Sequence, residues 1–191
     1  MKYPNLYKAF NRHIDLPIDV YLDLEGRLIH KKLGKKEFLF REGEVVKYLP
    51  FINDGLMINY IVEEDGEEHV IQIRGTGLWL GDLYSFFSDV RTRFNIQTYQ
   101  PTELLMINHE TFDYITKNHP VYEKFFRLNI QEAYVQTLNR IYNLHSATAE
   151  ERYLELIKNI PDLLDKIPHY LIASYLNIKP QSLSRIRKNI K

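Results

Sequence analysis

The sequence predicts an α+β protein in which an N-terminal antiparallel β-barrel or jelly roll is followed by one long helix and then by a C-terminal helix-turn-helix. Three observations predict this fold. Apolar residues form short alternating or continuous runs up to residue 107, they recur with helical spacing from about residue 118, and residues 169–188 fit two short helices around a tight turn. These changes of pattern divide the chain into segments 1–117, 118–147 and 148–191.

The barrel is expected from six strand-like runs separated by glycine-containing turns. The turns are Asn53-Asp54-Gly55, Glu64-Asp65-Gly66 and Gly75-Thr76-Gly77. Asp-Gly between two apolar runs is a strong hairpin signal. Many short strands at regular spacing are typical of antiparallel barrels and sandwiches. The predicted strands cover residues 38–40, 49–52, 56–62, 69–73, 94–99 and 104–107.

A long helix is predicted after His119-Pro120, because proline fits the first turn of a helix and no strong breaker follows before Ser146. About 25 residues at 1.5 Å each give a length of nearly 40 Å. Apolar and polar residues recur along it at alternating steps of three and four, the spacing of a coiled-coil seam. The seam residues are Leu128, Gln131, Val135, Leu138, Tyr142 and His145.

Both sides of this helix carry apolar residues, so we expect two packing partners. We predict that Leu128, Val135, Leu138 and Tyr142 form a homodimer interface with the same helix of a second subunit. The other apolar residues are expected to pack on the barrel; they are Phe125, Ile130, Tyr134 and Ile141. A single buried core helix is the alternative, and the polar seam residues Gln131 and His145 leave it open.

The C-terminal helical hairpin is predicted from residues 169–188. Ala173 is small where the two helices would cross, Asn177 tolerates the left-handed conformation that ends a helix, and Pro180 suits a first turn. The apolar faces that would hold the pair together come from Ile172, Leu176, Ile178, Leu183 and Ile186. Ile190 is expected to share the inward face of the second helix.

The outward face of this second helix is polar and basic. Glutamine can pair with adenine and arginine with guanine in the major groove, whereas serine and lysine suit phosphates. The net charge of the chain is zero, but no acidic residue occurs from Lys166 to the C-terminus, which ends in Lys191. We therefore predict double-stranded DNA as a partner, and a protein contact is the alternative. The candidate DNA-contacting residues are Gln181, Ser182, Ser184, Arg185, Arg187 and Lys188.

The composition of the chain argues against several other classes of protein: thiol-dependent, exported, membrane-bound and metal-binding. There is no cysteine, which excludes disulfides and thiolate chemistry. No export signal or membrane-spanning run is present, so a cytoplasmic protein without a membrane partner is expected. His30, His69 and His109 lack the spacing of metal ligands, and we expect neither a metal site nor an enzyme. The rival hypothesis is a cupin-like β-barrel that binds a metal or small molecule, or acts as an enzyme, with a helical tail.

Several short motifs resemble those of the Crp/Fnr family of bacterial transcription regulators. They are residues 40–44 (FREGE), Gly55 in a strand turn, 80–83 (LGDL), 148–153 (TAEERY), and 172–176 (IASYL) followed by 183–187 (LSRIR). The resemblance covers the chain from about residue 20. It implies a cyclic-nucleotide-binding-like barrel as a sensor, a dimerisation helix, and a helix-turn-helix in which Gln181, Ser182 and Arg185 face base edges. Two such helices would read a palindromic operator in successive major grooves.

The effector motif departs from that family. Members that bind a cyclic nucleotide carry a glycine-glutamate pair and then an arginine beside a small hydroxyl residue and an alanine. Here Gly81-Asp82 is followed by Arg91-Thr92-Arg93-Phe94, with a bulky residue in place of a small one. We expect no cofactor and no cyclic nucleotide, interpret Asp82 and Arg91 as a solvated ion pair, and leave an unidentified small-molecule effector open. The candidate pocket comprises Gly81, Asp82, Leu83, Arg91, Thr92 and Arg93.

Overall fold

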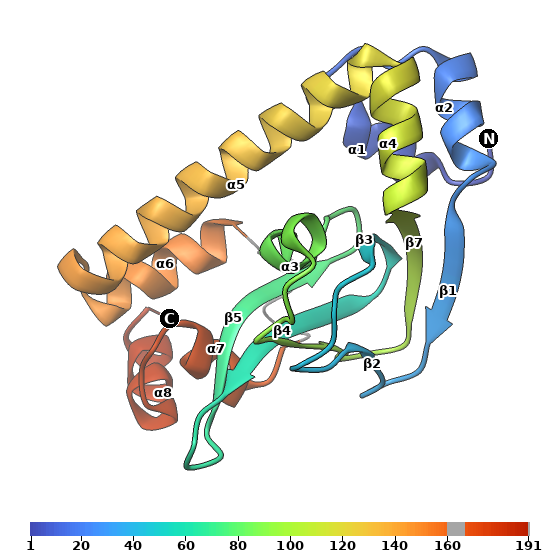
Figure 1. The fold of residues 1–191 in the computed structure, drawn as a ribbon. Helices are drawn as coiled ribbons and strands as arrows, with labels where there is room; N and C mark the ends of the chain where they lie inside the picture. The colour runs from blue at the N-terminus through green and yellow to red at the C-terminus, as the bar shows by residue number, and fades with distance from the viewer. Residues whose placement is uncertain (160–166, 191) are drawn as a thin grey trace.

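The computed structural model describes residues 1–159 and 167–190, and its strands form two antiparallel sheets (Figure 1). The first sheet has the order β1-β7-β3 and the second the order β2-β6-β4-β5. The strands are β1 (Ile29–Leu33), β2 (Phe38–Phe40), β3 (Tyr48–Asp54), β4 (Leu56–Val62), β5 (Glu68–Gly75), β6 (Asn95–Thr98) and β7 (Thr102–Asn108). Each of the six predicted runs corresponds to one of β2 to β7, and β1 was not predicted.

Two glycine turns fix the register of the strands around β4. At Gly66 the backbone has φ +85°, and its N–H donates to Glu63 O at 2.9 Å, which closes the β4–β5 hairpin predicted from Asp65-Gly66. At Gly55, between β3 and β4, φ is +123°, and an added Cβ would lie 2.7 Å from Thr102 Cα. Only glycine fits there, because the turn must pass directly beside β7.

One hydrophobic core lies between the sheets and the N-terminal helices. The helices α1 (Pro4–Phe10), α2 (Ile18–Glu25) and α4 (His109–Asn118) gather at one end of the barrel, together with the start of α5 (Pro120–Ser146). Edge-on aromatic contacts join them: the Phe10 ring lies 4.5 Å from Phe125 and 5.2 Å from Tyr122, centroid to centroid. No sequence pattern predicted α1 and α2, whose stability comes from this packing.

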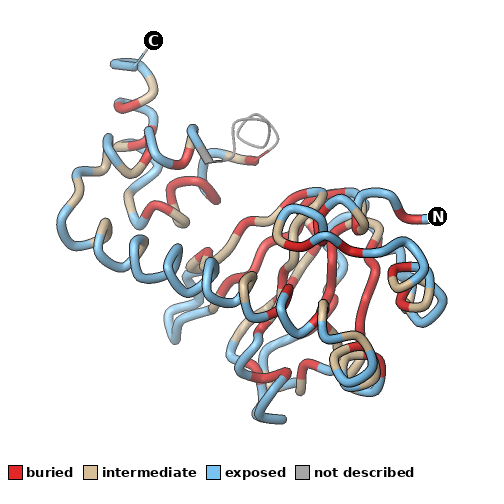
Figure 2. The backbone as a smooth tube through the Cα atoms, turned by 90° about the horizontal axis from the view of Figure 1, so that it is seen from above, coloured by how far each residue is buried: buried red, intermediate tan, exposed pale blue. Residues whose placement is uncertain are grey.

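Only the first two turns of α5 are buried in the barrel, through Tyr122, Phe125 and Phe126. The helix then runs beyond the barrel, as Figure 1 shows, and Figure 2 shows its outer side exposed along most of its length. The predicted helix is confirmed, and Phe125 packs as expected. The prediction that Ile130, Tyr134 and Ile141 pack on the barrel is wrong: these side chains are 38%, 63% and 50% exposed, because another side of the helix, the one that carries Arg140, faces strand β5.

A second hydrophobic core joins the other sheet to the C-terminal helices. These are α6 (Ala149–Asn159), α7 (His169–Tyr175) and α8 (Pro180–Asn189). Strand side chains such as Ile58 and Ile73 share this core with Leu171, Ile172 and Leu183 of α7 and α8. Helix α6 begins with a capping box, in which Glu151 accepts from the backbone N–H of Thr148 at 2.7 Å. The C-terminal helices are therefore packed directly on the sheet.

Candidate nucleic-acid interface and effector cassette

The turn between α7 and α8 has the geometry that its sequence predicts. Asn177 is left-handed, with φ 52°. Its N–H donates to Ser174 O at 3.0 Å, and the N–H of Ile178 donates to Ala173 O at 3.0 Å. This pair of bonds is a Schellman motif, which satisfies the last carbonyls of α7. Lys179 is extended, and Pro180 then opens α8, so the two helices form a helix-turn-helix.

Helix α8 presents two distinct faces. Leu183 and Ile186 are buried against the second core, and Ala173 of α7 is fully buried, so the inward face is confirmed at these positions. Ile190 is 37% exposed, and its predicted inward position is wrong because α8 ends at Asn189. Of the six candidate DNA-contacting residues, the exposed ones are Gln181, Ser184, Arg185 and Lys188, and the half-buried ones are Ser182 and Arg187.

Two of these side chains have partners within the helical hairpin. Ser184 Oγ donates to Pro180 O at 3.1 Å, one turn earlier in α8, and Arg187 Nη1 bonds to His169 Nε2 of α7. Gln181, Arg185 and Lys188 have no protein partner among the described residues. The first turn of α8 contains no acidic residue, and its last turn carries Arg187 and Lys188. The outer face of α8 is therefore polar and basic along its length, while Lys191 lies outside the described residues.

The helix-turn-helix is tied to the barrel by contacts that the sequence analysis missed. Ser174 Oγ donates to Glu68 O and accepts from Val70 N, both at 2.9 Å, so that one hydroxyl bridges α7 to β5. The guanidinium of Arg140 in α5 donates to Val70 O at 3.3 Å, to Tyr175 O at 3.1 Å and also to Ile71 O. No local signal marks either residue, because each partner is distant in the sequence.

The predicted dimer seam lies on the outer side of α5. Val135, Leu138 and Tyr142 are exposed, while Leu128 is half-buried against the first core. Ile130, Tyr134 and Ile141, which were expected to face the barrel, adjoin the seam instead. At 100° per residue these six exposed side chains span about 140° of the helix circumference. The resulting apolar strip, from Ile130 to Tyr142, is unusually large for a helix facing solvent.

Three of the six residues of the candidate effector pocket, which we call the effector cassette, are held by hydrogen bonds within the protein: Asp82, Arg91 and Thr92. Asp82 caps α3 (Leu83–Ser88) by accepting from Ser85 N at 3.2 Å, and its other oxygen accepts from Thr92 Oγ1 at 2.8 Å. Arg91 donates instead to Gly43 O at 2.6 Å. The interpretation of Asp82 and Arg91 as a solvated ion pair is wrong: Asp82 is buried, and the two side chains bond elsewhere. Gly81 is half-buried, and Leu83 and Arg93 are exposed.

The three histidines considered as metal ligands contact three different partners. His30 lies 2.6 Å from Glu103, His69 lies 3.5 Å from Glu63, and the His109 ring stacks on Phe86 at 4.0 Å. Within residues 1–159 and 167–190, no group of three or more His, Asp or Glu side chains is arranged to hold a metal ion. No helix in this part of the chain is long and apolar enough to cross a membrane.

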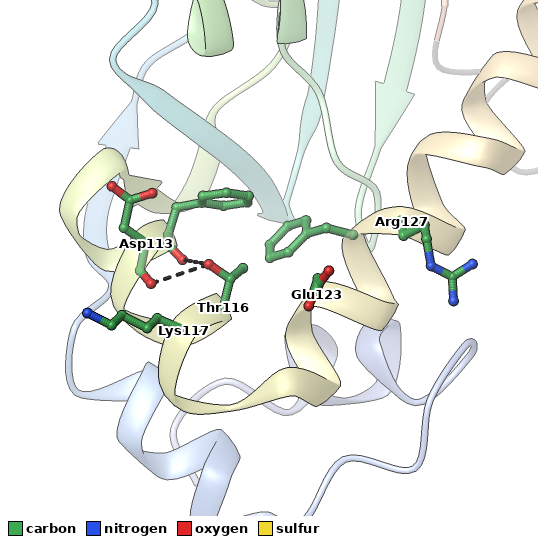
Figure 3. A pocket seen from close by; sticks show the side chains of 7 residues that line it. Asp113, Thr116, Lys117, Glu123 and Arg127 are labelled. Atoms are coloured by element: carbon green, nitrogen blue, oxygen red, sulfur yellow. Dashed lines mark hydrogen bonds between the residues drawn. The ribbon is translucent and has the colours of Figure 1, made fainter.

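A shallow surface depression lies between α4 and α5 (Figure 3). Thr116 is at its centre and donates to Phe112 O at 2.8 Å, within α4. The ionisable side chains around it alternate in sign: Asp113 and Lys117 on α4, Glu123 and Arg127 on α5. The depression therefore has neither an unbonded hydroxyl nor an excess of charge.

Comparison with known proteins identifies the fold. Residues 30–119 match the family model of the cyclic nucleotide-binding domain. FixK2 of Bradyrhizobium japonicum superimposes with a TM-score of 0.73 at 16% identity, over 85% of this chain and 84% of that one. The c-di-GMP responsive global regulator CLP of Xanthomonas campestris gives 0.72 at 13% identity, over 91% of each chain. This chain is Crp/Fnr-like in fold.

The Crp/Fnr-like fold extends over the barrel, the long helix and the C-terminal helices alike. The catabolite activator protein of Thermus thermophilus matches 92% of this chain, with a TM-score of 0.56 and 18% identity. Among proteins of curated function, none matches the sequence. The resemblance predicted from the five sequence motifs is thereby confirmed for the fold, and the match to the cyclic nucleotide-binding domain model lies in the barrel and the helix after it.

Proposed function

We propose that the protein is a homodimeric transcription regulator of the cytoplasm that reads a palindromic DNA operator with α8. The observation that carries the proposal is the outer face of α8, where Gln181, Arg185 and Lys188 are exposed on a helix held at a fixed angle by the buried Leu183 and Ile186. A helix of this kind fits the major groove, where arginine and glutamine read base edges and lysine contacts phosphates.

The apolar strip on α5 supports a dimer as the reading unit. Residues Val135, Leu138 and Tyr142 recur at the spacing of a coiled-coil seam and are exposed in a single chain. Pairing two copies through this strip would remove the strip from water and place two α8 helices about a two-fold axis. Symmetry of this kind requires an operator whose half-sites repeat as a palindrome.

The cassette supports a regulator that does not depend on a cyclic nucleotide. Asp82 already accepts from Ser85 and Thr92, and Arg91 already donates to Gly43 O, so a ribose or phosphate would have to break these bonds. Breaking a bond to a buried carboxylate costs free energy that a new ligand must offset. We therefore propose that DNA binding persists when cyclic nucleotides are absent.

Selection of bound duplexes from a random DNA pool, without added ligand and at near-physiological salt, tests the proposal. We expect a palindromic consensus. If the pool stays random, or if the consensus appears only after a cyclic nucleotide is added, the proposal is wrong in its specificity or in its independence from that ligand. Affinity for the selected duplex should fall steeply as salt rises, because phosphate contacts release counterions.

Arg185→Ala tests the reading role of α8. A bidentate arginine–guanine contact contributes about 1–3 kcal/mol, so binding to the selected operator should weaken roughly 5- to 150-fold. Fluorescence anisotropy measures this loss. Lys47→Ala, which removes an exposed cation just before β3, is the matched control and should bind as the unaltered protein does. Equal losses on operator and random DNA would contradict base reading by Arg185.

A further inference from the structure

A cavity of about 780 Å³ lies between α5, β5 and the C-terminal helices. Its walls come from the end of α1, from β5 and the loop after it, from the inner side of α5, and from α6 and α7. Sites for small molecules typically enclose about 300–1,000 Å³. None of the six cassette residues lines this cavity. It is therefore a second space, large enough for a ligand and separate from residues 81–93.

The walls of the cavity carry an excess of positive charge. Four arginines line it, at positions 12, 74, 140 and 152, against two acids, Glu132 and Glu155. The acids are directed to other groups: Glu132 lies 3.5 Å from His13 Nε2, and Glu155 accepts from Asn143 Nδ2 at 2.6 Å. Within the described chain, none of the four arginines lies within 4.0 Å of a carboxylate.

Arg74 is a half-buried cation with few polar partners. Its single hydrogen bond among the described residues is from Nη1 to the carbonyl of its neighbour Ile73, at 3.2 Å. Burial lowers the pKa of its guanidinium, and the positive charge of Arg140 lowers that pKa further. A desolvated cation without a carboxylate partner is costly and is retained in proteins mainly where something pairs with it. Arg74 therefore lacks the counter-ion that its surroundings call for.

Arg140 connects the same cavity to the helix-turn-helix. Its guanidinium donates to carbonyls of β5 and to Tyr175 O, and it stacks 4.3 Å over the Tyr175 ring. A ligand group that draws Arg140 away would loosen its bond to the end of α7. The two arginines thus place a site for negative charge at the contact between strand β5 and the proposed DNA-reading unit.

We propose that this cavity binds a small organic anion, whose carboxylate or phosphate group is held between Arg74 and Arg140. Binding neutralises the uncompensated charge and shifts the contact of α7 with β5. The regulatory half of this proposal rests on the proposed DNA-binding function, whereas the binding half does not. Asparagine and glutamine side chains along α5, such as Asn129 and Gln136, supply further hydrogen bonds to the rest of the ligand.

The binding half is tested by NMR, by following the arginine Nε–H signals while three probes of similar size are titrated into the millimolar range. Benzoate carries the carboxylate, phenyl phosphate the phosphate, and benzamide is neutral. We expect one anion or both to shift the signals of Arg74 and Arg140 saturably, at one molecule per chain, and benzamide to have at least tenfold weaker affinity. The stronger anion identifies the ligand group. Absence of saturable shifts with both anions, or equal binding of benzamide, overturns the proposal.

Arg74→Met distinguishes a ligand-binding arginine from a structural one. If Arg74 serves an anion, this variant should lose at least tenfold in anion affinity while its melting temperature stays level or rises, because an unpaired, half-buried charge has been replaced by an apolar side chain. Lys47→Met, at an exposed cation outside the cavity and the candidate effector pocket, should change neither property. A large fall in melting temperature would assign Arg74 to the folded structure instead.

DNA binding supplies the last readout. The anion that saturates the cavity should change the affinity of the intact protein for its selected operator at least threefold, and Arg74→Met should abolish that change. If the anion binds without altering DNA affinity, the proposed regulation of DNA binding is wrong, but the proposed anion site is still supported. If no DNA is bound under any condition, the proposed function fails, while the NMR result still decides the site.

Discussion

The hydroxyl of Ser174 offers a direct measurement of how firmly the helix-turn-helix is attached to the barrel. Ser174→Ala removes two hydrogen bonds, to Glu68 O and from Val70 N, at the half-buried contact of α7 with β5. At a net value of about 1 kcal/mol each, the free energy of unfolding should fall by about 2 kcal/mol. For a chain of this size, that corresponds to a melting temperature lower by roughly 4–8 °C.

The matched control is Ser184→Ala. That hydroxyl donates only to Pro180 O within its own helix and is exposed. Both substitutions raise helix propensity by roughly 0.5 kcal/mol, so the difference between them isolates the contact with β5. Urea unfolding followed by circular dichroism measures both variants. The reasoning is refuted if Ser174→Ala is as stable as Ser184→Ala, since the hydroxyl bridge would then contribute nothing to the attachment.

Two other changes test the dimer and the acid sensitivity of the barrel. Leu138→Glu should weaken the dimer at least tenfold in analytical ultracentrifugation, because it places two carboxylates in the seam. The control is Leu22→Glu, at a leucine that is 44% exposed against 46% for Leu138, and it should leave the dimer intact. Equal weakening by both substitutions would contradict the predicted seam. Hydrogen bonds from Asn53 and His30 hold the pKa of Glu103 below its ordinary 4.5. A carboxylate with a lowered pKa stabilises the folded state, and this stabilisation is lost as the pH falls from 4.5 through the lowered pKa. The free energy of unfolding of Glu103→Gln, measured by urea titration, should therefore fall less over this pH range than that of the unaltered protein. An equal fall in both proteins would disprove the role of Glu103.

The parts of the fold that could be predicted from the sequence are those whose structure depends on neighbouring residues in the chain. Apolar runs bounded by glycine turns placed β2 to β7, and Pro120 and Ser146 mark both ends of α5. Strand β1 was missed because its central residues, 30–32, are polar and exposed, and only Leu33 is buried. Its pairing with β7, and not its own composition, makes it a strand.

The candidate sites divide in the same way. Asn177 and Pro180 predicted the helix-turn-helix because turn chemistry is local. The bonds of Asp82 to Ser85 and Thr92 could not be read from spacing, since they depend on how residues 81–93 fold back on themselves. The charge of the large cavity was equally hidden, because its four arginines are spread between positions 12 and 152.

The core shared by the second sheet and the C-terminal helices determines how this protein unfolds and how it responds to proteolysis. Ile58 and Ile73 are covered by Ile172 and Leu183, so separating the barrel from the helix-turn-helix would expose apolar surface on both. Neither part would then have a fully polar surface. Heat should therefore melt the barrel and the C-terminal helices in one cooperative transition, and a protease that cut the chain between α5 and α6 would leave two fragments prone to aggregation instead of two usable domains.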